Sequence, residues 1–138
     1  MDVDVGFIYT HERHLIGPLV SSLAQSGRGI SMRLILVDNA STDGVEPWRQ
    51  TIPDTTVIRN ERRLGYAANL NRILEAATGR YALLLNTDMY FDPHEQCVAK
   101  MVRFMDSHPD CGVSGCRIAC LFKWTLRRVA LKLFDSEP

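Results

Sequence analysis

MRLILVDNASTDG, residues 32–44, contains the clearest structural signal in this sequence. Its first seven residues form a short apolar run, and polar turn residues follow at once. A run of this length that ends in turn residues is typical of a strand buried in a sheet. Residues 4–10, DVGFIYT, have the same form, and apolar residues at helical spacing lie between the two runs. Residues 4–38 therefore predict a strand, a helix and a second strand.

The alternation of strands and helices continues along the chain. Residues 54–60 and 80–86 predict two further strands, and the later one is apolar enough to be covered on both faces. Residues 66–79 predict the helix between them, and a short helix is expected near residues 45–50. Alternation of this kind implies an α/β protein with a mostly parallel sheet in three layers, α/β/α.

The end of the sequence is expected to add one more helix and a fifth strand. Apolar residues at helical spacing predict a helix around residues 98–105. Asp92 precedes Pro93, and Glu95 lies three residues after Asp92, which is the pattern of a helix N-cap with a capping box. Asp92 is therefore interpreted as structural. Residues 111–118 are the candidate fifth strand.

Length and charge limit the classes of protein to consider. The 138 residues suffice for one domain, and the net charge of zero favours neither nucleic acid nor an anionic membrane as a partner. The N-terminus lacks the pattern of a secretory signal, and no apolar run approaches the roughly 18 residues of a membrane-spanning helix. We therefore expect a cytoplasmic protein. The four cysteines are interpreted as reduced thiols: Cys97, Cys111, Cys116 and Cys120.

Polar clusters follow three of the predicted strands: YTHER at residues 9–13, DNASTDG at residues 38–44 and NTD at residues 86–88. Because parallel strands end at the same edge of a sheet, these clusters should gather where α/β proteins bind ligands. No glycine-rich phosphate loop follows the first strand, which argues against P-loop nucleotidases and dinucleotide dehydrogenases. A nucleoside diphosphate held by a metal ion remains open.

Two aspartates in these clusters have the chemistry to bind such a ligand. A carboxylate at the end of a strand, such as Asp38, can accept hydrogen bonds from a ribose diol or a base N–H. Ser41, Thr42 and Asp43 are assigned to the turn that follows it. Asp88 has no evident local role, and one carboxylate is enough for a hard divalent cation when a diphosphate and water supply the other ligands.

Taken together, these segments resemble the family 2 glycosyltransferases, which are inverting nucleotide-sugar enzymes of GT-A fold, and most closely the rhamnosyltransferase-like branch. The similarity covers roughly residues 3–118, and YTHER, LVDNASTDG, NERRLGYAANLN and LLLNTD occur in the order found in the family. The resemblance implies a Rossmann-like, three-layer GT-A fold and hexosyl or rhamnosyl transfer in cell wall or polysaccharide biosynthesis.

The resemblance also implies roles for residues around the nucleotide. Thr10 and Glu12 should line the base and ribose, and Asp38 should bind one of them. Gly65 should let the chain pass close to the nucleotide. Asn71 should brace this region from the following helix.

For the diphosphate, the resemblance places NTD at the D-x-D position of the family. Asp88 matches the metal-binding acid, and Asn86 stands where many members carry the first acid. The implied cofactor is Mg²⁺ or Mn²⁺, and the implied reaction is direct displacement at the anomeric carbon by a hydroxyl of a saccharide, lipid-linked or protein acceptor. The catalytic general base is expected in a C-terminal half of the family fold that this chain lacks.

The resemblance ends near Cys120, which suggests a nucleotide-sugar-binding domain at residues 1–120 and a separate tail at residues 121–138. The tail mixes aromatic and basic residues in the manner of an amphipathic helix. It is expected either to cover the sheet edge, for instance in a homodimer, or to make a peripheral membrane contact.

Two alternatives to a glycosyltransferase stay open from the sequence. The first is a catalytically inactive donor-binding or assembly module, because neither the acceptor half nor the general base can be identified. The second is a receiver-like regulator, but such a domain needs an acidic pair after the first strand, where YTHER supplies only Glu12.

Overall fold

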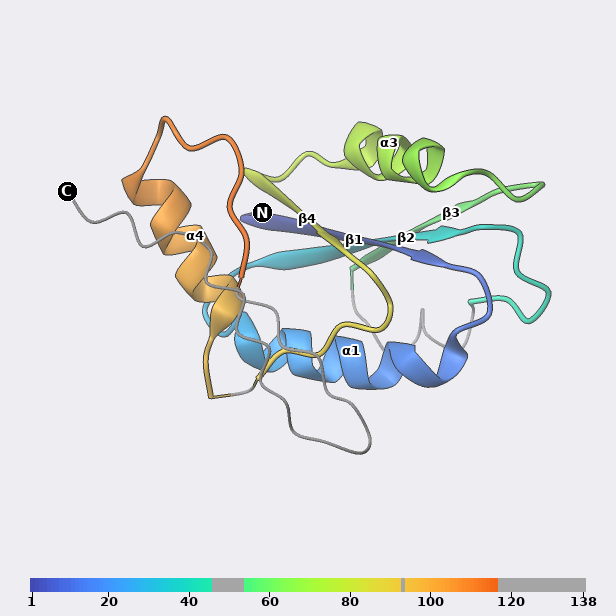
Figure 1. Ribbon diagram of the computed structural model, residues 1–138, viewed down its shortest axis with the longest axis horizontal. Coiled ribbons are helices and arrows are strands. Elements are labelled where there is room, and N and C mark those ends of the chain that lie inside the picture. Colours follow the sequence, from blue (N-terminus) through green and yellow to red (C-terminus); the bar gives the residue numbers. More distant parts are fainter. Residues whose placement is uncertain (46–53, 93, 117–138) are drawn as a thin grey trace.

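The computed structural model describes residues 1–45, 54–92 and 94–116 of the chain. Its strands form one parallel sheet in the order β3-β2-β1-β4, and helices flank the sheet on both faces (Figure 1). The strands are β1 Val3–Tyr9, β2 Met32–Asp38, β3 Thr55–Arg59 and β4 Tyr81–Leu85. The helices are α1 Arg13–Ser26, α3 Tyr66–Ala76 and α4 Cys97–Ser107. The predicted three-layer α/β fold is confirmed.

Two apolar clusters join the layers. On one face, the side chains of β1 and β2 that include Phe7 and Leu36 pack with Leu19 of α1 and Val98 of α4. On the other face, Ile35 and Val37 of β2 pack with Ile73 of α3. Because both faces of β1 and β2 are covered, apolar residues fill the middle of both strands, as the sequence indicated, and charged residues lie only near their ends.

The packing of α3 on the sheet depends on a glycine in β1. A Cβ atom added at Gly6 would lie 2.1 Å from Cγ2 of Ile73, whose side chain is fully buried. This methyl group is attached to the branched Cβ of Ile73, so it cannot move aside without moving the helix. Glycine therefore sets how closely α3 approaches the sheet.

We expect Gly6→Ala to lower the free energy of unfolding by about 2 kcal/mol, the typical cost of overpacking a core. Urea denaturation of the two proteins measures this difference. Gly112→Ala is the control, because a Cβ added at Gly112 meets no atom within 4 Å. Equal stability of Gly6→Ala and Gly112→Ala would show that α3 is not packed this closely.

The expectation that β4 is covered on both faces is wrong for the part of the chain that the structure describes. Ala82 is exposed, and Leu84 retains 37 % of its accessible surface. The reason is the position of β4 at the edge of the described sheet, whereas α3 packs on β1 and β2. An apolar sequence did not distinguish an edge strand from a central one.

The prediction that Asp92 opens the last helix is also wrong, because α4 begins at Cys97. The Asp92 carboxylate accepts the N–H of His94 at 2.9 Å, which makes a local turn. The Glu95 carboxylate pairs with Lys100 instead of capping the helix. At the start of α4, the N–H of Val98 donates to the hydroxyl of Ser26 in α1, at 3.1 Å. A distant residue thus satisfies the helix terminus.

The predicted fifth strand is absent from residues 111–116, the part of it that the structure describes. Residues 46–50 of the expected short helix, residues 117–118, Cys120 and the tail at residues 121–138 lie outside the described residues. Cys97, Cys111 and Cys116 are free cysteines, as predicted. Within the described ranges, no helix has the length and apolar character needed to span a bilayer.

Candidate functional site

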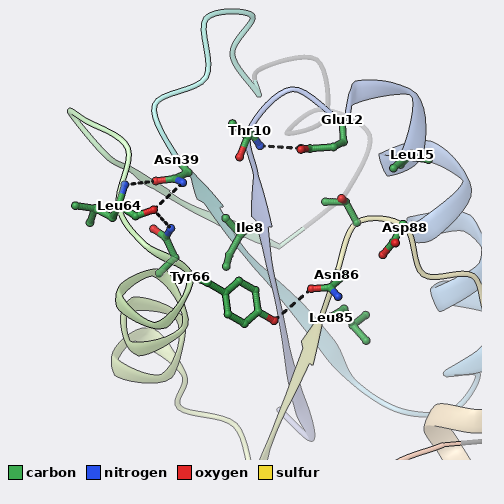
Figure 2. Close-up of a pocket in the computed structure, with 12 residues that line it drawn as sticks. Ile8, Thr10, Glu12, Leu15, Asn39, Leu64, Tyr66, Leu85, Asn86 and Asp88 are labelled. Carbon is green, nitrogen blue, oxygen red and sulfur yellow. Dashed lines mark hydrogen bonds between the residues drawn. The ribbon is translucent and has the colours of Figure 1, made fainter. Parts of the chain in front are cut away.

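A cavity of about 470 Å³ lies at the carboxyl ends of β1 and β4. Figure 2 shows side chains from the loops after β1, β2 and β4, and from the start of α3, around this space. Four of the residues expected to bind a ligand line it together: Thr10, Glu12, Asn86 and Asp88. The polar clusters after β1 and β4 therefore do gather at one edge of the sheet.

Glu12 turns back onto its own loop. Its Oε2 atom accepts the backbone N–H groups of Thr10 at 2.9 Å and of His11 at 3.0 Å. Burial raises the pKa of the Glu12 carboxyl, but these hydrogen bonds outweigh it and hold the pKa below its ordinary value. The carboxylate is therefore ionised at neutral pH and fixes the shape of the loop that enters α1.

The two polar residues after β4 differ in their contacts. The Tyr66 hydroxyl reaches from α3 and donates to Oδ1 of Asn86 at 3.2 Å (Figure 2). The Asp88 side chain is exposed and makes no hydrogen bond or ion pair with any residue in the described ranges. Asp88 is thus the carboxylate of this cavity that is available to a ligand.

Asp38 does not line the cavity. Its carboxylate is fully buried and accepts hydrogen bonds from Arg59 at 2.5 Å and from the N–H of Ser41 at 2.8 Å. Its neighbour Asn39 lines the cavity in its place. Asp38 is the last residue of β2, and the residue that meets the cavity is Asn39, the first of the loop that follows.

The turn after β2 is held by its own polar residues, as the sequence indicated. Oδ2 of Asp43 accepts the Tyr9 hydroxyl at 2.6 Å, and the Thr42 hydroxyl lies 3.1 Å from Nε2 of His11. Burial and the neighbouring Asp43 carboxylate raise the pKa of Tyr9 to about 12. Asp43 is therefore interpreted as structural.

The remaining two expected residues are Gly65, directly before α3, and Asn71, within α3, and neither lines the cavity. Gly65 is the N-cap of α3, and a Cβ added there would meet no atom within 4 Å, so the space beside it is open. Asn71 is exposed on the helix surface. The structure does not bring Asn71 to the cavity.

A network of three asparagines that sequence reasoning missed supports the cavity wall. Nδ2 of Asn60 donates to the side-chain oxygens of Asn39 at 2.9 Å and of Asn69 at 2.7 Å. The side chain of Asn39 accepts the N–H of Leu64 at 2.8 Å and donates to the carbonyl oxygen of Leu64 (Figure 2). The side chain of Asn69 donates to the same carbonyl oxygen. The amides thereby hold the backbone of Leu64 at the cavity wall. Asn60 directly follows β3, and this position was the available signal.

Replacing Asn69 with alanine should lower the free energy of unfolding by about 2 kcal/mol, because Asn60 and Leu64 each lose a hydrogen bond in a buried environment. Asn71→Ala is a matched control in the same helix, and we expect it to change stability by less than about 0.5 kcal/mol. Chemical denaturation of both variants checks this. Equal losses at the two positions would contradict the network.

The described residues contain no group of three or more histidine, cysteine or acidic side chains that could by itself hold a metal ion. The donors after β4 are oxygen atoms, which a hard divalent cation prefers. With one exposed carboxylate at Asp88, they fit a cation that takes its remaining ligands from a bound anion and water. They do not fit a site built by the protein alone.

Comparison with solved structures shows the same fold in known glycosyltransferases. Residues 1–349 of TarS from S. aureus superpose with a TM-score of 0.66 at 23 % identity, covering 79 % of this chain and 33 % of that one. The mannosyltransferase PcManGT from Pyrobaculum calidifontis, in complex with GDP-Man and Mn²⁺, superposes with a TM-score of 0.64 at 28 % identity. The match covers 75 % of this chain and 32 % of that one. TarS has also been solved with UDP.

The chain spans about a third of the length of these structures. A comparison with curated proteins found no match. The model of the family described as Glycosyl transferase family 2 matches residues 5–137, and this match extends beyond the resemblance recognised at residues 3–118. With nearly its whole length matched, the chain belongs to glycosyl transferase family 2.

Proposed function

We propose that the cavity binds a nucleotide diphosphate sugar together with Mg²⁺ or Mn²⁺, as the donor site of an inverting glycosyltransferase of the rhamnosyltransferase-like branch. The observation that carries this proposal is Asp88, an exposed carboxylate on the cavity without a partner among the described residues. Its place directly after β4 is where parallel α/β sheets bind their ligands.

The cation would be held by Asp88, with diphosphate oxygens and water as its other ligands. A bound divalent cation neutralises negative charge on a leaving diphosphate. The structure of PcManGT with GDP-Man and Mn²⁺ supports this assignment, because that mannosyltransferase shares the fold. Of Asn86 and Asp88, Asp88 is the one without a hydrogen bond to any described residue, since the Tyr66 hydroxyl already bonds to Asn86.

The nucleoside would lie against the loop after β1. Thr10 lines the cavity there, and Glu12 holds the loop in shape through its backbone contacts. The open space beside Gly65 leaves room for the same part of the ligand. The structural neighbour TarS binds UDP, which is consistent with a nucleoside diphosphate at this edge of the fold.

Transfer needs a general base that takes the proton of the acceptor hydroxyl. Among the residues that the structure describes, the carboxylates that line the cavity are Glu12 and Asp88. Glu12 is held by two backbone N–H groups, and Asp88 is assigned to the cation, so we assign the base to neither. This observation favours a second candidate function, a module that binds the donor without transferring its sugar.

Isothermal titration calorimetry with UDP, GDP and dTDP, each with and without Mn²⁺, tests the donor site. We expect Mn²⁺-dependent binding of at least one nucleotide and its loss with EDTA. Binding of none of them would contradict the proposal. Incubation with labelled sugar donors and saccharide acceptors separates the two candidates, because any transfer by this chain excludes the non-catalytic module.

A further inference from the structure

Asp38 and Arg59 lie outside the cavity and close a turn beside it. They end β2 and β3, and they are paired in the parallel register, so their side chains lie on one face of the sheet. Arg59 donates to Oδ2 of Asp38 at 2.5 Å and to the carbonyl oxygen of Ser41 at 3.1 Å. Oδ1 of Asp38 accepts the N–H of Ser41. One arginine thus links both ends of the turn at residues 38–41.

This turn carries Asn39 to the cavity. The N–H of Asn39 donates to the carbonyl oxygen of Tyr9 at 2.8 Å, and its side chain makes paired hydrogen bonds with the backbone of Leu64. Asn39 and Leu64 both line the cavity. A change in the turn would therefore reach the cavity wall through a single amide side chain.

The burial of the pair decides between two roles for Asp38. Its side chain has 0 % exposure, whereas the side chain of Arg59 has 60 %. Both carboxylate oxygens already accept hydrogen bonds from the protein. A base or ribose could reach Asp38 only after Arg59 had left it.

We propose that Asp38 and Arg59 are a positioning pair that sets the cavity wall through Asn39, and that Asp38 does not contact the donor. The sequence-based expectation that Asp38 binds the base or ribose is thereby replaced. The inference rests on the proposed donor site for its binding measurements. It predicts that a substitution in the pair weakens the binding of every nucleotide by the same factor, because the substitution disturbs the cavity wall and removes no contact with the base.

The test measures the affinities of UDP and GDP with Mn²⁺ in Asp38→Asn, Arg59→Ala, Arg59→Lys and the Asp38→Asn/Arg59→Ala double variant. Each of the first two should weaken both nucleotides by the same factor, about tenfold, which corresponds to one charge-assisted hydrogen bond. The double variant should bind the nucleotides as tightly as either single variant does, because the two residues act as a unit. Arg59→Lys keeps the charge and should recover part of the affinity.

Ser41→Ala is the matched control within the turn. The Ser41 hydroxyl is buried with no hydrogen-bond partner in the described part of the chain, and the contacts with Asp38 and Arg59 use the backbone of Ser41. Unchanged affinity is expected. Tighter binding in Arg59→Ala, or an altered preference between UDP and GDP in Asp38→Asn, would overturn the proposal in favour of a direct contact.

A second measurement does not depend on nucleotide binding. Hydrogen exchange of the Asn39 side-chain amide, followed by NMR, should be about tenfold faster in Arg59→Ala than in the wild-type chain, since the contact with Leu64 loosens. Unchanged exchange would overturn the positioning role. If the wild-type chain binds neither nucleotide but exchange still accelerates, the proposed donor site fails and the positioning pair stands.

Discussion

Replacing Asp4 with asparagine should lower the free energy of unfolding by about 3 kcal/mol, the lower end of the cost of breaking a buried ion pair. Asp4 lies in β1 with no exposed surface, and its carboxylate forms paired hydrogen bonds of 2.8 Å with Arg33 of β2. It also accepts the N–H groups of Thr78 at 2.6 Å and Gly79 at 2.7 Å. The side chain therefore ties two strands to the segment that leads into β4.

The lower end of that range applies because the Arg33 side chain is partly exposed, so its charge keeps some hydration in the variant. The amide in Asp4→Asn would present N–H donors to N–H donors and leave one partner unsatisfied. Urea denaturation at neutral pH measures the difference. Asp110→Asn, a substitution at an exposed site, is the control and should be neutral. Equal stability of the two variants would contradict the buried clamp.

The same substitution should change how stability depends on pH. Burial raises the pKa of Asp4, but Arg33 and the N–H groups of Gly79 and Thr78 outweigh it, so the folded-state pKa lies below the ordinary 3.8. Such a group stabilises the fold fully above its unfolded pKa, and this contribution is lost as pH falls through the folded pKa. The difference between wild type and Asp4→Asn should thus shrink below about pH 4. A constant difference down to pH 2 would contradict this linkage.

Asp88→Asn should weaken the Mn²⁺-dependent binding of a nucleoside diphosphate by about 100-fold or more. Loss of residues that merely orient metal ligands costs about 10- to 100-fold in affinity, and Asp88 is proposed as the direct protein ligand. The amide keeps the size of the side chain but removes the negative charge that a hard cation needs. Calorimetry of the variant with Mn²⁺ and the preferred nucleotide measures the loss.

Asp92→Asn is the matched control for Asp88. Both aspartates are exposed and lie in the segment after β4, but Asp92 bonds to the N–H of His94 and does not line the cavity. We expect wild-type affinity in Asp92→Asn. Loss in Asp92→Asn with retention in Asp88→Asn would place the cation elsewhere in this segment.

The elements of the sheet were predictable because short apolar runs with polar ends have few other interpretations. The predicted bounds of β2 agree with the structure at both ends, and β1 is shifted by one residue. The start of α4 was not predicted correctly, because the side chain that caps this helix belongs to Ser26, 72 residues earlier in the sequence than Val98. A contact of this range leaves no local pattern.

The face of Asp38 could not be derived from the sequence. Residues 34–37 are apolar without alternation, since β2 is buried on both faces, so nothing in the pattern says which face meets the cavity. The pairing of Tyr9 with Asp38 and of Asp38 with Arg59 supplies this information. Only the pairing with neighbouring strands shows that Asp38 turns away from the cavity, whereas Asn39 lines it.

The buried asparagine of α3 was within reach of the sequence. Asn69 lies four residues before Ile73 and therefore shares its face, while Asn71 points away from it. The apolar stripe that the sequence predicts for this helix consists of Ala67, Leu70, Ile73, Leu74 and Ala77. In the structure, however, Leu74 retains 48 % of its accessible surface. A stripe centred on Ile73 would have placed Asn69, and not Asn71, against the sheet.

Paramagnetic broadening by Mn²⁺ in the presence of UDP or GDP tests the central claim most directly, because it locates the cation in the full chain. With Mg²⁺ as the diamagnetic reference, amide signals of residues 86–88 and of Thr10 should disappear first. Those of Arg103 and Asp106 should persist, since Asp106 bonds to Tyr81 at the start of β4, away from the cavity. Broadening centred on α4, or none that depends on the nucleotide, would contradict a donor site at Asp88.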